Sequence, residues 1–211
     1  MPMPLLSDWL TVFIVGLVVV VTPGANFTMT MRNSLVHSRQ AGLYTAFGVG
    51  IGSIIHVTYC LVGIGAIISQ SILLFNALKW LGAAYLIYIG IKSLRAKKLT
   101  NVENLPIARN ISNRSAIRVG FLTSLLNPKA TLLFLAVFTQ LIQPNSPLTA
   151  QIIYGLTVIA LEVIWYSLVA LFISQRNIKR LLTSFLHWIE RVMGAVLILL
   201  GLRLAFAKET E

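Results

Sequence analysis

The chain has 211 residues, of which 57% are hydrophobic and only 11% are charged. A soluble domain of this length could not bury so much apolar surface, so we expect an integral membrane protein. The 17 basic and 6 acidic residues give a formal net charge of +11. Because the cations lie mostly between apolar stretches, they are typical of topology signals, and we expect no nucleic-acid partner.

Apolar stretches along the chain are long enough for helices that cross a hydrocarbon core, which takes roughly 20 residues each. The fold class we predict is all-α, with six transmembrane helices at about residues 8–31, 41–69, 72–91, 117–142, 149–173 and 187–206. The connection around Ser69 to Asn76 is nearly apolar, so counts of five or seven spans stay open. No Lys or Arg precedes the first stretch, so we expect it to remain in the mature protein.

The first stretch is interrupted by the sequence Thr-Pro-Gly-Ala-Asn at residues 22–26. Pro23 and Gly24 cannot hold regular helical bonding, so the helix is predicted to break there. Backbone groups that lose their helical hydrogen bonds at membrane depth are tolerated only where they contact protein or line a water-filled cavity. The amide of Asn26 can bind either end of an amino acid or cap the broken helix, and both interpretations stay open.

The second stretch carries closely spaced small residues, a histidine and the one cysteine of the chain. Gly48, Gly50 and Gly52 predict close packing of this helix against its neighbours. His56 is a candidate for proton coupling, with a hydrogen-bonded packing role as the alternative. Cys60 alone excludes an intramolecular disulfide, and we expect it to be a packing residue.

The third stretch is followed by the only sizeable polar segment. Tyr85 and Tyr88 either line a cavity or belong to an interfacial belt. Residues 93–116 have too little apolar periodicity for a second domain. We predict a single transmembrane domain, 1–211, in which this segment is a cytoplasmic linker between a first repeat, 1–92, and a second repeat, 117–211.

The fourth stretch contains a second predicted break, at Asn127, Pro128 and Lys129. Breaks at corresponding positions of two halves are typical of a transporter's substrate site. With three spans each, the halves must enter the membrane from opposite sides. We therefore predict two inverted three-helix repeats whose broken helices, the first and the fourth, face one another. Like Asn26, Asn127 can bind substrate or cap its helix.

Lys129 and Glu162 lie near the centres of the fourth and fifth stretches. An isolated charge there costs at least ~2.5 to 3.5 kcal/mol, so we expect both to point inward and to face each other. A zwitterionic amino acid needs an anion for its ammonium group and a cation or helix N-terminus for its carboxylate, which these residues and the amides after Pro23 would supply. The alternative is an ion pair that only fixes helix packing.

The cations mark the orientation of the chain in the membrane. The connection around Ser69 to Asn76 and that around Gln143 to Thr149 carry no charge. By the positive-inside rule, both termini are expected outside and the basic segments in the cytoplasm of a bacterium, with the protein in the inner membrane. These segments hold Arg32, Arg39, Lys92, Arg95, Lys97, Lys98, Arg109, Arg114, Arg118, Arg176, Lys179 and Arg180.

The candidate site residues are few. No His-Glu-x-x-His, paired aspartates or Ser/His constellation lies within the spans, so we do not expect an enzyme, and nothing indicates a metal or organic cofactor. The proton-coupling candidates are Glu162 and His56. The substrate-binding candidates are Pro23, Gly24, Asn26, Asn127, Pro128, Lys129 and Glu162.

Taken together, the motifs resemble the LysE/RhtB superfamily of bacterial amino-acid exporters over almost the whole chain. The resemblance implies export of amino acids from the cytoplasm, driven by the proton gradient. The family usually has a second proline in the first motif, where this chain has Ala25. The segments that carry the resemblance are residues 22–26, 39–43 (RQAGL), 82–92 (GAAYLIYIGIK) and 120–130 (GFLTSLLNPKA).

The segment 160–165, ALEVIW, is similar to the fifth span of threonine and homoserine exporters, so the resemblance favours a small neutral substrate. A lysine or arginine exporter is the alternative, because Glu162 suits a cation although Lys129 repels it. A membrane assembly protein that transports nothing is the alternative from another class. Lipid surrounds the spans, and so small a bundle is compatible with a homodimer.

Overall fold

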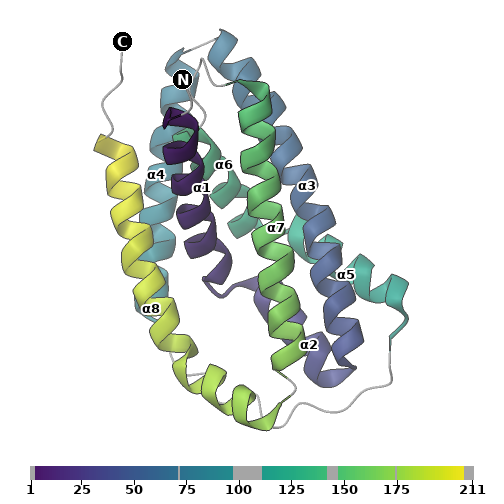
Figure 1. Cartoon of the computed structure of the whole chain (residues 1–211). Coiled ribbons are helices and arrows are strands. Elements are labelled where there is room, and N and C mark those ends of the chain that lie inside the picture. The colour runs from purple at the N-terminus through teal and green to yellow at the C-terminus, as the bar shows by residue number, and fades with distance from the viewer. Residues whose placement is uncertain (1–2, 71, 97–110, 142–146, 174, 207–211) are drawn as a thin grey trace.

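The computed structural model describes residues 3–70, 72–96, 111–141, 147–173 and 175–206. This part of the chain is all-helical, as predicted, and its helices form an elongated bundle (Figure 1). The helices are α1 (Met3–Val21), α2 (Ala25–Val36), α3 (Arg39–Gln70), α4 (Ile72–Leu94), α5 (Asn113–Leu125), α6 (Pro128–Leu141), α7 (Leu148–Phe172) and α8 (Arg176–Phe206).

The first predicted break separates α1 from α2, which meet at a bend of 55°. Thr22 still closes a helical bond, its amide donating to the carbonyl of Val18 at 3.1 Å. Pro23 has no amide to continue the ladder, and Gly24 is extended, with φ −163° and ψ −162°. The prediction of a broken first helix is confirmed.

The second predicted break separates α5 from α6. The amide of Asn127 bonds the carbonyl of Ser124, three residues back, at 3.1 Å, and Thr131 then bonds Asn127 to begin the new helix. Pro128 occupies the first position of α6, where a missing amide costs nothing because no partner exists for it. This prediction is also confirmed.

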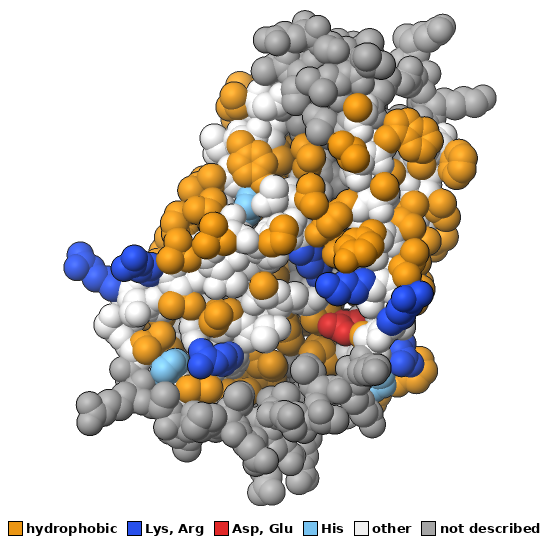
Figure 2. Space-filling model, turned by 180° about the vertical axis from the view of Figure 1, so that it is seen from behind, with side chains coloured by type: hydrophobic (Ala, Val, Ile, Leu, Met, Phe, Trp, Pro, Cys, Tyr) orange, Lys and Arg blue, Asp and Glu red, His pale blue; other side chains and the backbone are white. Residues whose placement is uncertain are grey.

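The long helices form two groups around α1. Helix α4 packs against α8 and α6, α3 packs against α5 and α7, and α1 contacts α6, α7 and α8. Helix α1 begins and α8 ends at the same end of the bundle (Figure 1). Basic side chains lie from the middle of the face drawn in Figure 2 downward.

Glycines let α3 approach its neighbours closely. A Cβ atom on Gly48 would collide with the backbone carbonyl of Ile117 on α5, and one on Gly50 would lie 2.5 Å from Val163 Cγ2 on α7. Gly52 likewise faces α5. The packing role predicted for these three glycines is confirmed.

Cys60 lies within an apolar core cluster that joins α1, α3, α6 and α7. It is buried together with Val57, Phe134, Phe138 and Val158. The predicted packing role of this cysteine is confirmed.

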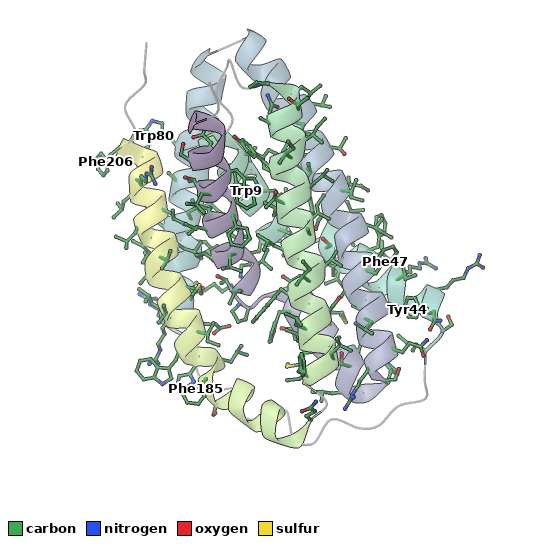
Figure 3. All side chains as sticks on the ribbon, viewed as in Figure 1. Trp9, Tyr44, Phe47, Trp80, Phe185 and Phe206 are labelled. Atoms are coloured by element: carbon green, nitrogen blue, oxygen red, sulfur yellow. The ribbon has the colours of Figure 1, made fainter. Side chains whose placement is uncertain are left out.

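The outer surface of the bundle is strongly apolar. Trp80 is 56% exposed and Phe206 77% exposed, and both point away from the helices in Figure 3. Orange apolar side chains also cover much of the face in Figure 2. Contiguous exposed apolar surface of this kind is expected of a protein that sits in lipid.

Three described helical segments are long and apolar enough to cross a membrane: Arg39–Gly63, Leu148–Phe172 and Ser184–Arg203. The bent pair Ser7–Val21 and Ala25–Val36 would form a fourth span. The full set of six spans and the inverted repeats therefore stay predictions.

Two helices begin earlier than the predicted spans. Helix α5 begins at Asn113, so the last residues assigned to the linker are helical; Ser112 caps this helix by accepting from the amide of Ser115 at 3.2 Å. Helix α8 begins at Arg176, so that the predicted basic loop before the sixth span is helical. Its early turns are too polar for a span, but Lys and Arg are good helix formers.

Other predicted segments lie outside the described residues. They include residues 97–110 of the linker, Ser71 in the apolar connection, and residues 142–146 between the fourth and fifth predicted spans.

Candidate functional site

The two helix breaks meet through buried asparagines. Asn127 Nδ2 donates to Asn26 Oδ1 at 3.2 Å, which joins residues 101 positions apart. The other amide atom of Asn127, Oδ1, accepts from the backbone amide of Lys129 at 3.1 Å and so caps α6. The capping interpretation is thus realised for Asn127, and the same side chain also links the two breaks.

Lys129 reaches across to the first break. Its Nζ donates to the carbonyl oxygens of Pro23, at 2.9 Å, and Thr22, at 3.3 Å. The turn at Pro23 and Gly24 diverts these carbonyls from regular helical bonding, and the ammonium group satisfies them. Gly24 makes room, because a Cβ there would lie 3.2 Å from Lys129 Nζ.

Glu162 lies on α7 and is 5% exposed. Its carboxylate accepts a hydrogen bond from the hydroxyl of Ser53 on α3. Ser53 Oγ in turn lies 3.4 Å from Ser124 Oγ on α5, so three helices meet at this carboxylate. A donated hydrogen bond is what a buried carboxylate requires.

The expected pairing of Glu162 with Lys129 is only partly correct. Both residues point inward and line the same small cavity. Among the described residues, however, no ion pair joins them, because Lys129 is held by the backbone carbonyls of the first break and Glu162 by Ser53.

His56 is 1% exposed and hydrogen-bonded through both ring nitrogens. Nε2 lies 2.9 Å from the carbonyl oxygen of Ser124, so this nitrogen carries the proton, and Nδ1 lies 2.7 Å from Tyr59 Oη. The ring also stacks on Phe134 at 5.4 Å. His56 lines neither of the two cavities described below.

Two adjoining cavities surround the breaks. The larger has a volume of about 630 Å³ and the smaller about 30 Å³. Gly24, Asn127 and Lys129 line both, so these residues stand between them. Asn26 and Glu162 line only the smaller cavity, whereas Pro23 and Pro128 line only the larger.

The larger cavity is completed by residues of α4 and α8. Tyr85 and Tyr88 line it, so the cavity interpretation of these two tyrosines is correct. Lys92 on α4 and Glu190 on α8 add charge to the wall. Acidic and basic side chains lie close together in the lower half of the face in Figure 2.

Two residues of the site, Glu190 and Ser53, were not predicted from the sequence. Glu190 stands next to Arg191 near the start of the predicted sixth span, where charged residues commonly mark a membrane interface. The helical repeat is the signal that places Glu190. Gly194 and Leu197, four and seven positions later, share its face of the helix and pack against α4. Glu190 therefore lies on the face of α8 that looks towards α4.

The described residues hold no group of three His, Cys, Asp or Glu side chains that could bind a metal ion. An all-helical apolar bundle in which two broken helices meet at buried polar groups beside a cavity is the architecture of a membrane transporter. Comparison with known proteins agrees: the chain belongs to the LysE type translocator family, whose pattern matches residues 17–208. The resemblance noted from the motifs is confirmed.

Several known proteins are similar to this chain. The homoserine/homoserine lactone efflux protein of Salmonella typhimurium is 32% identical over 157 residues, covering 74% of this chain and 75% of that protein. Two uncharacterized membrane proteins are each 27% identical: YrhP of Bacillus subtilis, covering 90% of this chain and 94% of its own, and YahN of Escherichia coli, covering 99% and 93%. No solved structure matches the chain.

Proposed function

We propose that this protein exports small neutral amino acids, such as threonine or homoserine, from the cytoplasm across the bacterial inner membrane. The observation that carries the proposal is the meeting of the two helix breaks, where Asn127 bonds Asn26 and Lys129 bonds the Pro23 carbonyl beside a cavity. The similarity to a homoserine/homoserine lactone efflux protein supports this substrate class. The substrate site comprises Pro23, Gly24, Asn127, Pro128 and Lys129, which line the larger cavity, whereas Asn26 and Glu162 lie next to it on the smaller one.

In this proposal the proton gradient drives export by antiport, and Glu162 is the proton carrier. Glu162 is the carboxylate that lines the inner, smaller cavity, and Ser53 donates to it. Two inverted halves would rock about the paired breaks, giving access to one side of the membrane at a time. A proton that enters from outside would neutralise Glu162 and favour release of the substrate.

The orientation in the proposal follows the cations. Helix α1 begins and α8 ends at one end of the bundle, which suits an even number of crossings with both termini outside. The basic side chains below the middle of Figure 2 would then lie towards the cytoplasm.

A lysine or arginine exporter is the less favoured substrate class. The larger cavity carries Lys92 and Lys129 but a single carboxylate, Glu190, among its lining residues. A cationic side chain entering this cavity would meet net repulsion. A zwitterion meets attraction at both of its charged ends.

Counterflow in proteoliposomes tests the function. Purified protein is reconstituted with one unlabelled amino acid inside, and the uptake of labelled threonine, homoserine, lysine or leucine is measured with and without a pH gradient. We expect saturable exchange of threonine or homoserine. Exchange of lysine alone would favour the basic-substrate alternative, and no exchange of any amino acid by folded protein would favour a membrane assembly protein.

A further inference from the structure

The space beside Glu162 is too small for an amino acid. The inner cavity, which Glu162 lines together with Asn26 and Tyr166, has a volume of about 30 Å³. A cavity of roughly 10 to 15 Å³ of such space holds one water molecule, so this one has room for only one or two. In this conformation Glu162 is therefore accessible to water or a proton but not to a substrate.

The larger of the two cavities, from here on the outer cavity, has the size and the charges that a substrate requires. Its volume of about 630 Å³ lies within the range of roughly 300 to 1,000 Å³ that is typical of small-molecule sites. Glu190 lies on one of its walls, and Lys129 and Lys92 lie on others. All three charged side chains therefore face the same cavity.

These opposite charges line the same cavity without forming ion pairs with one another. Among the described residues no ion pair joins Glu190 to Lys129 or to Lys92, and Lys129 Nζ is bonded to the Thr22 and Pro23 carbonyls instead. An anion and cations held apart across a cavity are complementary to a molecule that carries both charges.

We propose that the outer cavity is the binding site for the zwitterionic head of an α-amino acid. Glu190 binds the ammonium group, and Lys92 and Lys129 bind the carboxylate. The inference rests on the proposed export function. It assigns separate roles to two carboxylates: Glu190 recognises the substrate and Glu162 carries the proton.

Lys129 connects the two tasks, because it lines both cavities. A substrate carboxylate that binds Lys129 Nζ competes with the carbonyls of Thr22 and Pro23 for its protons. Binding in the outer cavity thereby loosens the contact between the two broken helices, next to the cavity that holds Glu162.

Equilibrium binding tests the assignment with three probes. Tritiated threonine is bound to purified protein in lipid nanodiscs and displaced by threonine, by N-acetylthreonine, which lacks the ammonium group, and by threoninamide, which lacks the carboxylate. For the unmodified protein we expect threonine to displace best. Loss of one charge-assisted contact should weaken either analogue by about tenfold or more.

Variants then test which charged residue binds which end of the substrate. Glu190→Gln should lower threonine affinity by about tenfold and abolish the discrimination against N-acetylthreonine, while Glu190→Asp, which keeps the charge, retains that discrimination. Lys92→Gln should reduce the discrimination against threoninamide. The matched control Asp8→Asn, which removes an exposed carboxylate at the start of α1, should keep both affinity and discrimination.

The outcomes separate this inference from the proposed function. If unmodified protein neither binds nor exchanges threonine or homoserine, the proposed function fails. If it exchanges them and Glu190→Gln keeps full affinity and discrimination, the function stands and the assignment of Glu190 is overturned. Size-exclusion profiles of the variants exclude misfolding as the cause, and the retained discrimination of Glu190→Asp confirms the charge as the determinant.

Discussion

Asn127 on one broken helix donates its side-chain amide to Asn26 on the other at 3.2 Å, and both side chains are buried. The contact holds the two irregular segments together, and each segment otherwise leaves backbone groups without helical partners. The same Asn127 side chain also caps α6 through the Lys129 amide. One residue therefore stabilises both the end of its own helix and the joint between two helices.

We predict that Asn127→Ala destabilises the protein more than Asn26→Ala does. Both variants lose the buried hydrogen bond, which costs about 1 to 3 kcal/mol when one partner is left unsatisfied. Asn127→Ala also loses a helix cap, worth about 1 kcal/mol. Thermal unfolding in detergent, followed by intrinsic fluorescence, should place the midpoint of Asn127→Ala lowest. Equal midpoints would contradict the dual role of this side chain.

Replacing Glu162 by Gln should uncouple transport from the proton gradient. The amide keeps the size of the side chain and can still accept from Ser53, but it cannot take up a proton. We expect counterflow to continue without a pH gradient and the stimulation by a gradient to disappear. Proteoliposome uptake with and without an imposed gradient measures both, with Asp8→Asn as the control. Full proton-driven transport by Glu162→Gln would exclude its role as the proton carrier.

His56 offers a second test of the proton path. Its ring nitrogens are engaged by the Ser124 carbonyl and the Tyr59 hydroxyl, and it lines neither cavity. We therefore expect His56→Ala to lower the thermal midpoint, through a loss of about 1 to 3 kcal/mol, and to preserve the response of uptake to a pH gradient. A folded variant that transports without any such response would place His56 in the relay.

Two glycines on α3 provide a matched pair for the packing argument. A Cβ on Gly48 would collide with the backbone carbonyl of Ile117, whereas one on Gly63 would meet nothing within 4 Å. Gly48→Ala should lower the thermal midpoint of unfolding, because the backbones of α3 and α5 must separate. Gly63→Ala should leave it unchanged or raise it, since Ala favours a helix over Gly by up to about 1 kcal/mol. The opposite order would contradict the packing.

Local residue chemistry sufficed to predict much of this molecule from its sequence. Pro23 and Pro128 lack the amide that a continuous helix needs, so both breaks were predictable from the neighbouring residues alone. The packing roles of Gly48 and Cys60 followed from their positions within apolar stretches. The charged residues of the sixth stretch were harder, because a Glu beside an Arg near a span end is common at interfaces, and Glu190 was missed.

The amino-acid sequence by itself determined where the helices form and where they break, because those properties depend on residues within a few positions of one another. Only the tertiary structure decided which polar groups meet: Asn26 with Asn127, Lys129 with the Pro23 carbonyl, and Glu162 with Ser53. Each partner comes from a helix distant in the sequence. Its identity therefore depends on which side chains the packing of the helices brings within hydrogen-bonding distance. The same packing left Glu162 beside a cavity of about 30 Å³ and Glu190 beside one of about 630 Å³.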